Sequence, residues 1–303
     1  GDAFTANNPF NQVSLTGGAN SRVKLVGSGT IEFHHFSDQS GSGGPGYSGD
    51  IEVAGATLNF GDSNEIHDSS DVIVSSGTLN FAARSDTFNS LTISGGTTTG
   101  TSTGTITVTN AMTVSGGTVS GKTFSAGSYA LSGGTVSAVL AGSGNVTVSG
   151  DTTLNATNTF TGTVTVNTGA TLRSDNNRGL GATSSGTTVV SGGSLHLYSA
   201  SGTKSYGEDI TISGSGVSSS GAIQATGSNT ITGDITLAAN STLVSNASAT
   251  FTVGSAGSVD GSSGDYDLTL AGAGDFSFAG DINLGDGDLT ISSTGTTTIT
   301  GAL

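Results

Sequence analysis

The chain has 303 residues, a formal net charge of -15 and 51 glycines, and it contains neither cysteine nor tryptophan. The negative charge excludes a nucleic-acid-binding surface, which needs clustered Lys and Arg, and it argues against attachment to anionic lipid. No apolar run approaches the roughly 20 residues of a membrane helix, so no membrane insertion of this segment is expected. Thr and Val alternate through most of the chain, which favours half-buried strands over disorder.

Residues 1–48 are the least repetitive part of the sequence. They contain the aromatic residues Phe4, Phe10, Phe33 and Phe36. The open end of a repeat array exposes strand edges and apolar core, so we expect this region to be an N-terminal cap or a set of atypical first coils. A binding tip is the alternative. In either case the four phenylalanines are candidate residues for assembly.

From residue 49 to the end, residues 49–303, short strands follow one another with glycine at the corners. Leu58-Asn59-Phe60 is matched by Leu79-Asn80-Phe81, 21 residues later. Residues that match at this spacing are expected to stack, with Leu and Phe in ladders in the core and the two asparagines in an outward amide ladder.

The tripeptide Ser-Gly-Gly marks the corners of the repeat. It recurs at 94–96, 115–117, 132–134 and 191–193, and looser glycine corners stand at Ala54-Gly55, Ser76-Gly77 and Thr168-Gly169. Glycine supplies the positive φ that lets the chain turn without a Cβ clash. Steps of 17–24 residues between corners predict an all-β parallel β-helix, a β-solenoid, because one such coil cannot bury its apolar face alone.

The repeat is clearest over residues 140–200. The run Leu140-Ala141-Gly142-Ser143-Gly144-Asn145-Val146-Thr147-Val148 is followed by Asn158-Thr159-Phe160-Thr161-Gly162-Thr163-Val164 and by Gly169-Ala170-Thr171-Leu172. It resembles the autotransporter-associated β-strand repeat of bacterial surface proteins. The resemblance implies a right-handed β-helix at the bacterial cell surface or outside the cell. Because that repeat is a structural module, the resemblance carries no catalytic residue over to this chain.

The last third of the chain is acidic, with no Lys or Arg after Lys204. Two pairs of carboxylates stand at glycine turns, and hard cations such as calcium prefer oxygen ligands of this kind. The four candidates are Asp265, Asp267, Asp286 and Asp288. The nine-residue motif of calcium-binding β-rolls is missing, so calcium stays a weak possibility and no other cofactor or metal is expected.

The sequence ends in a strand-like pattern that includes Ile299 and Leu303. An uncovered strand edge is a template for further β pairing. Ile299 and Leu303 therefore join the N-terminal phenylalanines as candidate assembly residues.

Three functional classes fit a β-helix, and the least favoured of them is a polysaccharide-active enzyme. Asp50 and Glu52 share one strand face with carboxylates about 6 to 7 Å apart, near the separation of an inverting glycosidase. Solvated strand faces explain the same pattern, and no basic cluster for an acidic polysaccharide accompanies it. His67 and His196 are isolated in sequence and are expected at the surface. We therefore expect no enzymatic activity.

Two functional classes remain beside the enzyme. The first is a structural extracellular β-solenoid protein, a subunit of a self-assembling fibre or matrix filament that grows by end-to-end stacking or strand addition. The second is an autotransporter-type adhesin passenger fragment that attaches to glycans or proteins of a host or another surface. Both place the protein outside the cell or on a bacterial surface, and the structural class is favoured.

Overall fold

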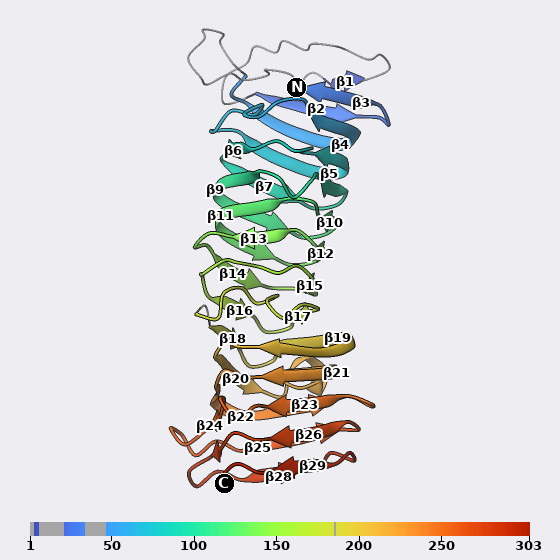
Figure 1. The fold of residues 1–303 in the computed structure, drawn as a ribbon. Helices are drawn as coiled ribbons and strands as arrows, with labels where there is room; N and C mark the ends of the chain where they lie inside the picture. The colour runs from blue at the N-terminus through green and yellow to red at the C-terminus, as the bar shows by residue number, and fades with distance from the viewer. Residues whose placement is uncertain (1–2, 6–20, 34–46, 185) are drawn as a thin grey trace. The chain divides into compact units, whose positions relative to one another are not determined.

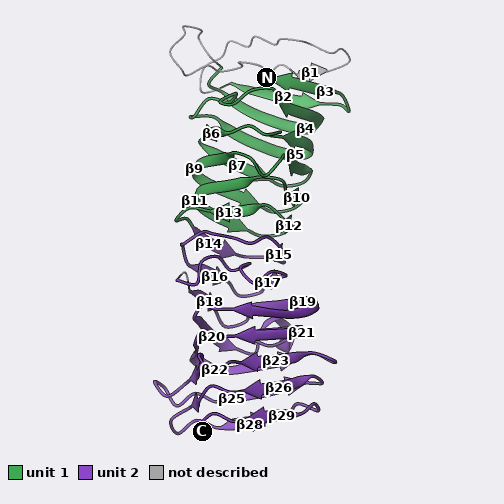
Figure 2. Cartoon of the chain, in the orientation of Figure 1, with its two compact units in different colours: residues 1–144 green, residues 145–303 purple. Residues whose placement is uncertain are grey.

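The computed structural model describes residues 3–5, 21–33, 47–184 and 186–303. The chain divides into two compact units, residues 1–144 and residues 145–303, which we call unit 1 and unit 2 (Figure 2). Phe10 and Phe36, and most of the region expected to form an N-terminal cap, lie outside the described residues.

Unit 1 is built from parallel strands stacked one on the next (Figure 1). Its longest pairings join β2 to β4, β4 to β5 and β9 to β11. The strands are β1 (Ala3–Thr5), β2 (Arg22–Val26), β3 (Thr30–Phe33), β4 (Asp50–Phe60), β5 (Asp71–Asn80), β6 (Asp86–Phe88), β7 (Ser90–Ile93), β8 (Thr97–Thr99), β9 (Thr105–Val114), β10 (Thr118–Val119), β11 (Thr123–Leu131), β12 (Thr135–Val136) and β13 (Val139–Ala141).

Unit 2 has the same construction, and among the described residues its only helix is the short 3-10 segment Val217–Ser219. The strands are β14 (Asn145–Val148), β15 (Thr152–Leu154), β16 (Val164–Val166), β17 (Thr171–Ser174), β18 (Thr187–Val189), β19 (Ser194–Tyr206), β20 (Ile210–Gly214), β21 (Ile223–Ile231), β22 (Ile235–Ser245), β23 (Thr250–Val253), β24 (Val259–Asp260), β25 (Leu268–Gly272), β26 (Asp275–Phe278), β27 (Ile282–Asn283), β28 (Leu289–Ile291) and β29 (Thr297–Ile299).

The strand pairings show that each unit is a solenoid. In unit 2, β14 pairs with β16, β16 with β18 and β18 with β20, while β15 pairs with β17, β17 with β19 and β19 with β21. A strand therefore lies beside the strand one turn later, and all of these pairs are parallel. The predicted all-β parallel β-solenoid is confirmed, with about 21 residues per turn.

Alternation of side chains fixes which face of each strand lies inside. Val164 and Val166 are fully buried on either side of a half-exposed Thr165, as period-two patterning predicts. In unit 1, the register pairs Leu58 with Leu79 and Asn59 with Asn80. The predicted amide ladder is confirmed, because Asn80 donates a hydrogen bond of 3.0 Å to the Asn59 side chain.

The glycine corners of unit 1 form a ladder of their own. Gly77, Gly96, Gly117 and Gly134 have φ values of 77°, 66°, 74° and 82°. A Cβ on Gly96 would lie 2.7 Å from the carbonyl oxygen of Gly77, and one on Gly134 would lie 2.8 Å from that of Gly117. Both the left-handed backbone and the close approach of the turn below therefore require glycine at these corners.

Candidate functional site

Polar and aromatic side chains gather on one outer face of unit 2, on strands β17, β19 and β21. The register places Arg173 beside His196 and His196 beside Gln224, while Tyr198 lies beside Thr226. These outward positions alternate with the fully buried Leu172, Leu195 and Leu197. We call the surface formed by Arg173, Asp175, His196, Tyr198, Gln224, Thr226 and Asn246 the Arg173 face.

Arg173 is fixed on this face from two sides. Its Nε and Nη2 donate hydrogen bonds of 2.7 and 3.0 Å to the two carboxylate oxygens of Asp175. Its guanidinium carbon lies 3.7 Å from the centre of the Tyr198 ring, which is a cation–π contact. The hydrogen bond with Asp175 raises the pKa of Arg173 above its ordinary value. The planar fork is thus held rigid, with donors left over beyond those that Asp175 engages.

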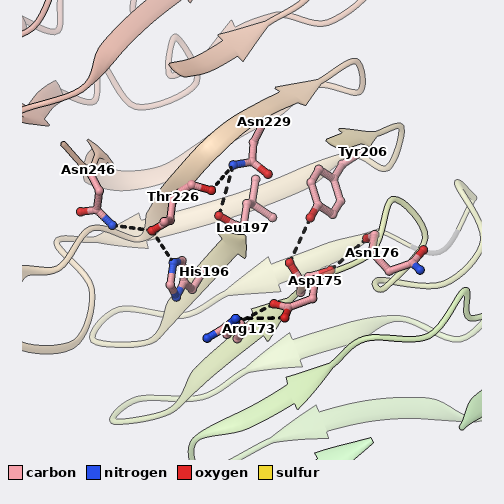
Figure 3. Close-up of polar contacts among 10 residues, drawn as sticks. Arg173, Asp175, Asn176, His196, Leu197, Tyr206, Thr226, Asn229 and Asn246 are labelled. Carbon is pink, nitrogen blue, oxygen red and sulfur yellow. Dashed lines mark hydrogen bonds and ion pairs between the residues drawn. The ribbon is translucent and has the colours of Figure 1, made fainter. Parts of the chain in front are cut away.

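His196 begins a chain of hydrogen bonds across the neighbouring strands (Figure 3). Its Nε2 lies 2.9 Å from the hydroxyl of Thr226, which accepts a 2.8 Å hydrogen bond from the Asn246 side chain. Gln224 donates to Asn246 over 3.3 Å. Burial, and then the charge of Arg173, hold the pKa of His196 below its ordinary value, so the imidazole is neutral at pH 7.

Buried hydrogen bonds behind the face keep its strands in place (Figure 3). The Tyr206 hydroxyl donates to the Ser174 carbonyl oxygen over 3.1 Å. The Asn229 amide donates to the carbonyl oxygens of Thr226 and Leu197 at 2.9 and 3.3 Å. Because Tyr206 and Asn229 are almost fully buried, these bonds act in a low-dielectric interior and stiffen the backbone that carries Arg173 and His196.

A shallow hollow of about 240 Å³ lies beside Arg173 and His196. Its other lining residues are Asp151, Thr152, Thr153 and Thr171. The Arg173 face has groups for hydrogen bonding and stacking. Its one histidine is bonded to the Thr226 hydroxyl, which also accepts from Asn246, and no carboxylate orients the ring as in a catalytic triad. The arrangement is therefore suited to binding a polar molecule.

The candidate assembly residues lie in both units. In unit 1, Phe4 belongs to β1, and Phe33 is 2% exposed and lies in register with Phe60. In unit 2, Ile299 is half-buried in β29, and Leu303 is 79% exposed. Phe33 is thus a core residue, whereas Leu303 presents its side chain to solvent.

The calcium candidates are tied into hydrogen bonds between turns. Asp265 accepts from the backbone N–H of Asp286, and Asp267 accepts from that of Asp288, each over 2.9 Å. Asp267 also accepts a 2.8 Å bond from Asn240 and lines a hollow of about 330 Å³. Within the described ranges, no group of three or more acidic, His or Cys side chains is placed to hold a metal ion.

Asp50 and Glu52 lie together in unit 1, in an ion-pair cluster. Lys24 lies 2.7 Å from Glu52, and Arg22 lies 3.6 Å from Asp50 and 3.5 Å from Glu52. Hydrogen bonds from Lys24 and Ser75 lower the pKa of Glu52, with burial opposing them. The general acid of a glycosidase needs a raised pKa, so this carboxyl has the opposite tuning.

Sequence reasoning missed the Arg173 face. His196 lies at the surface as expected, but the expectation that it is isolated is wrong, because the half-buried ring is bonded to Thr226. A signal was present in the alternation Leu195-His196-Leu197-Tyr198, which puts both rings on one outward face. What the sequence lacked was the register that brings Arg173 beside them.

Comparison with protein-family models, curated proteins and solved structures gives no match to this chain. The parallel β-solenoid is compatible with a β-helix surface protein, and no family match supports the autotransporter-associated repeat. In the described part of the chain, no helix is both long and apolar enough to cross a membrane.

Proposed function

We propose that the protein is a structural β-solenoid subunit that assembles with other copies of itself by adding turns at the edge formed by β28 and β29. The observation that carries the proposal is the parallel pairing of each turn with the next, which a turn of another copy can continue. Among the described residues, the large hydrophobic side chains that are exposed are Ile291, at 50%, and Leu303, at 79%. Ile291 lies in β28, and Leu303 follows the end of β29.

The pairing of the two strands supports the same proposal. β28 pairs with β25, and β29 pairs with β26, and no other described strand lies along them. The alternation of core residues continues into this turn, since Leu268 is followed in register by Leu289 and Leu270 by Ile291. One further turn of the same kind would pair the free backbone groups and cover the leucine and isoleucine side chains.

Assembly outside the cell or on a bacterial surface is part of the proposal. Its supports are the solenoid fold, the absence of cysteine and the low content of charged residues, 10%. The proposed role needs no enzymatic activity and no cofactor. Calcium binding at Asp265, Asp267, Asp286 and Asp288 remains a minor addition to it, testable by calorimetric titration.

Electron microscopy of the purified 303-residue chain at neutral pH, without ligand, tests the proposal. We expect filaments whose axial repeat equals the length of one molecule. Ile291→Lys should abolish them, because it places a charge on the pairing edge while removing little buried surface. The matched control is Ala200→Lys, which adds the same charge at an exposed position of β19.

Discrete single molecules at every accessible concentration of the wild-type chain would contradict assembly. The adhesin passenger is then the second candidate. The observation that favours it is the Arg173 face, where stacking and hydrogen-bonding side chains gather beside a hollow.

A further inference from the structure

The Arg173 face holds an aromatic side chain in an unusual position for this protein. Among the described phenylalanines and tyrosines whose burial is known, all are buried except Tyr198 and Tyr266, which are half-exposed. The centres of the Tyr198 and His196 rings are 5.9 Å apart, with the rings edge to face, and the Arg173 guanidinium lies over the Tyr198 ring. In a chain rich in small polar residues, these three side chains form a local group that can stack against a ligand and hydrogen-bond to it.

We propose that the Arg173 face binds a neutral glycan, a chain of uncharged hexose units that lies across strands β15, β17, β19 and β21. A sugar ring presents an apolar C–H face and a rim of neighbouring hydroxyls. Aromatic rings and a stacked guanidinium accept the apolar face, while planar groups with paired donors or acceptors bind the hydroxyls.

The outward side chains of the face stand in two columns along the stack of turns. Thr153, Arg173, His196 and Gln224 follow one another in register, and Tyr198 and Thr226 stand in the next column. Neighbouring strands are about 4.8 Å apart, so the first column spans roughly 14 Å from its first to its last member. That length suits several linked sugar units better than a single one.

The hollow gives the glycan a place to enter the surface. Its volume is about 240 Å³. Pockets for drug-sized ligands are slightly larger, from about 300 Å³ upwards. It therefore accommodates one ring or a branching substituent. Its threonine hydroxyls and the Asp151 carboxylate add acceptors and donors at the rim.

Charge decides in favour of a neutral ligand. Asp175 already offsets the charge of Arg173 through a bidentate pair. Asp151 adds a negative charge to the hollow, His196 is held neutral, and the whole chain carries -15. An acidic glycan would meet net repulsion here, whereas hydroxyls can bond to Asp175, Gln224 and Asn246 without a charge penalty.

The face is ordered before any ligand arrives. Arg173, His196, Thr226 and Asn246 are already held by one another or by neighbouring side chains. A ligand therefore does not have to immobilise these side chains itself, which is the main entropic cost of binding to long polar residues. The proposal is independent of assembly, and it supplies a ligand class for the adhesin alternative.

The test uses the full chain and soluble oligosaccharide probes. Saturation-transfer NMR and calorimetry would be run with cellohexaose, maltohexaose, laminarihexaose and mannohexaose, and with hexagalacturonate as an anionic probe. The Ile291→Lys background keeps the protein unassembled, so a failure of glycan binding is distinguishable from a failure of filament formation.

We expect at least one neutral probe to bind and to be preferred over hexagalacturonate. Tyr198→Ser and Arg173→Gln should each weaken it by about tenfold or more, which corresponds to about 1.4 kcal/mol. Tyr198→Phe keeps the ring and should bind as the wild type does. Tyr266→Ser removes the other half-exposed aromatic and should have no effect. Thermal melts of each variant check that the solenoid remains folded.

Three results would overturn the proposal. The first is that no neutral probe binds. The second is that binding survives both Tyr198→Ser and Arg173→Gln, which would place the glycan elsewhere. The third is a preference for hexagalacturonate, which would show that the face recognises acidic sugars.

Discussion

Units 1 and 2 share one coil but differ in which connection between successive turns they use more, although unit 2 also packs Phe251 against Phe276. Unit 1 stacks large aromatic rings in its interior. Phe81 lies 5.0 Å from Phe60, 6.4 Å from Phe88 and 5.8 Å from Phe124, measured between ring centres. All four rings are at most 2% exposed. Edge-to-face and offset arrangements of this kind add about 0.5–1.5 kcal/mol per pair beyond the burial itself.

Unit 2 more often connects its turns from the outside, with Asp and Asn side chains that accept a backbone N–H of the next turn. In unit 1, Asp50 accepts such a bond from Asp71. Each bond replaces or extends the pairing of strands where the backbone leaves the sheet. The donor–acceptor pairs are Thr163 to Asn145, Asp234 to Asp209, Ser258 to Asp234, Asp267 to Asn240, Asp286 to Asp265, Asp288 to Asp267, Thr296 to Asp275 and Ala302 to Asp281.

The difference explains the acidic last third of the chain. From the sequence alone, its aspartates suggest a charged surface or cation ligands. In the structure, many of them accept hydrogen bonds from a neighbouring turn. Several of these bonds span 21 residues, the length of one turn. A carboxylate at this spacing serves the same purpose as a stacked ring inside unit 1, because both require a residue of the right kind once per turn.

The largest effect should come from breaking the aromatic stack. Phe81→Ala removes a fully buried ring that contacts three others, so the free energy of unfolding should fall by about 3–5 kcal/mol. Urea unfolding of the variant, followed by circular dichroism, measures this loss. Tyr266→Ala, at a half-exposed aromatic of unit 2, is the control and should cost far less. A loss below about 1 kcal/mol for Phe81→Ala would show that the surrounding rings close the cavity.

A second test concerns a buried carboxyl that belongs neither to the aromatic stack of unit 1 nor to the external hydrogen bonds of unit 2. Glu208 is 1% exposed, and its Oε2 has no hydrogen-bond partner. Burial raises its pKa from 4.5 to about 7, against the lowering effects of a backbone hydrogen bond and of Arg178. The folded state therefore holds this proton more tightly than the unfolded state does. The contribution of this carboxyl to the free energy of unfolding is complete below pH 4.5 and is lost as the pH rises towards about 7.

The size of that loss follows from the shift, at about 3 kcal/mol. Glu208→Gln cannot ionise, so we expect its unfolding free energy to fall less than that of the wild type between pH 4.5 and 7.5. Asp86→Asn in unit 1 is the companion variant, because burial also raises the pKa of Asp86 to about 7. Parallel pH profiles for the wild type and Glu208→Gln would contradict the assignment.

The stacking in unit 1 could be predicted because it depends only on spacing. Phe60 and Phe81 stand 21 residues apart in matching segments, and a constant period places matching residues on top of one another. The glycine corners follow the same logic. Local alternation and one regular period are enough to derive both.

The Arg173 face depends on insertions of unequal length, and a regular period does not predict those. His196 follows its register partner Arg173 after 23 residues, while Gln224 follows His196 after 28. The extra residues are accommodated within the long β19 and the loop around the 3-10 segment Val217–Ser219. Side chains from different turns meet only once these lengths are known, so the site became visible in the structure alone.

The smallest effect should come from removing one external hydrogen bond of unit 2. The Asp234 carboxylate accepts from the backbone N–H of Ser258 at 2.9 Å and from its hydroxyl at 2.8 Å. Because Asp234 is exposed, Asp234→Ala should lower the free energy of unfolding by about 1 kcal/mol.

Asp234→Asn is the matched control, since it removes the same negative charge and keeps an acceptor oxygen at the same place. A chain with a net charge of -15 gains stability when any one carboxylate is neutralised, and both variants share that gain. Urea midpoints should therefore rank Asp234→Asn above Asp234→Ala, because the two variants differ only in the acceptor oxygen. If the two variants were equally stable, the acceptor oxygen would contribute nothing, and the aspartates of unit 2 would have to be explained by their charge instead.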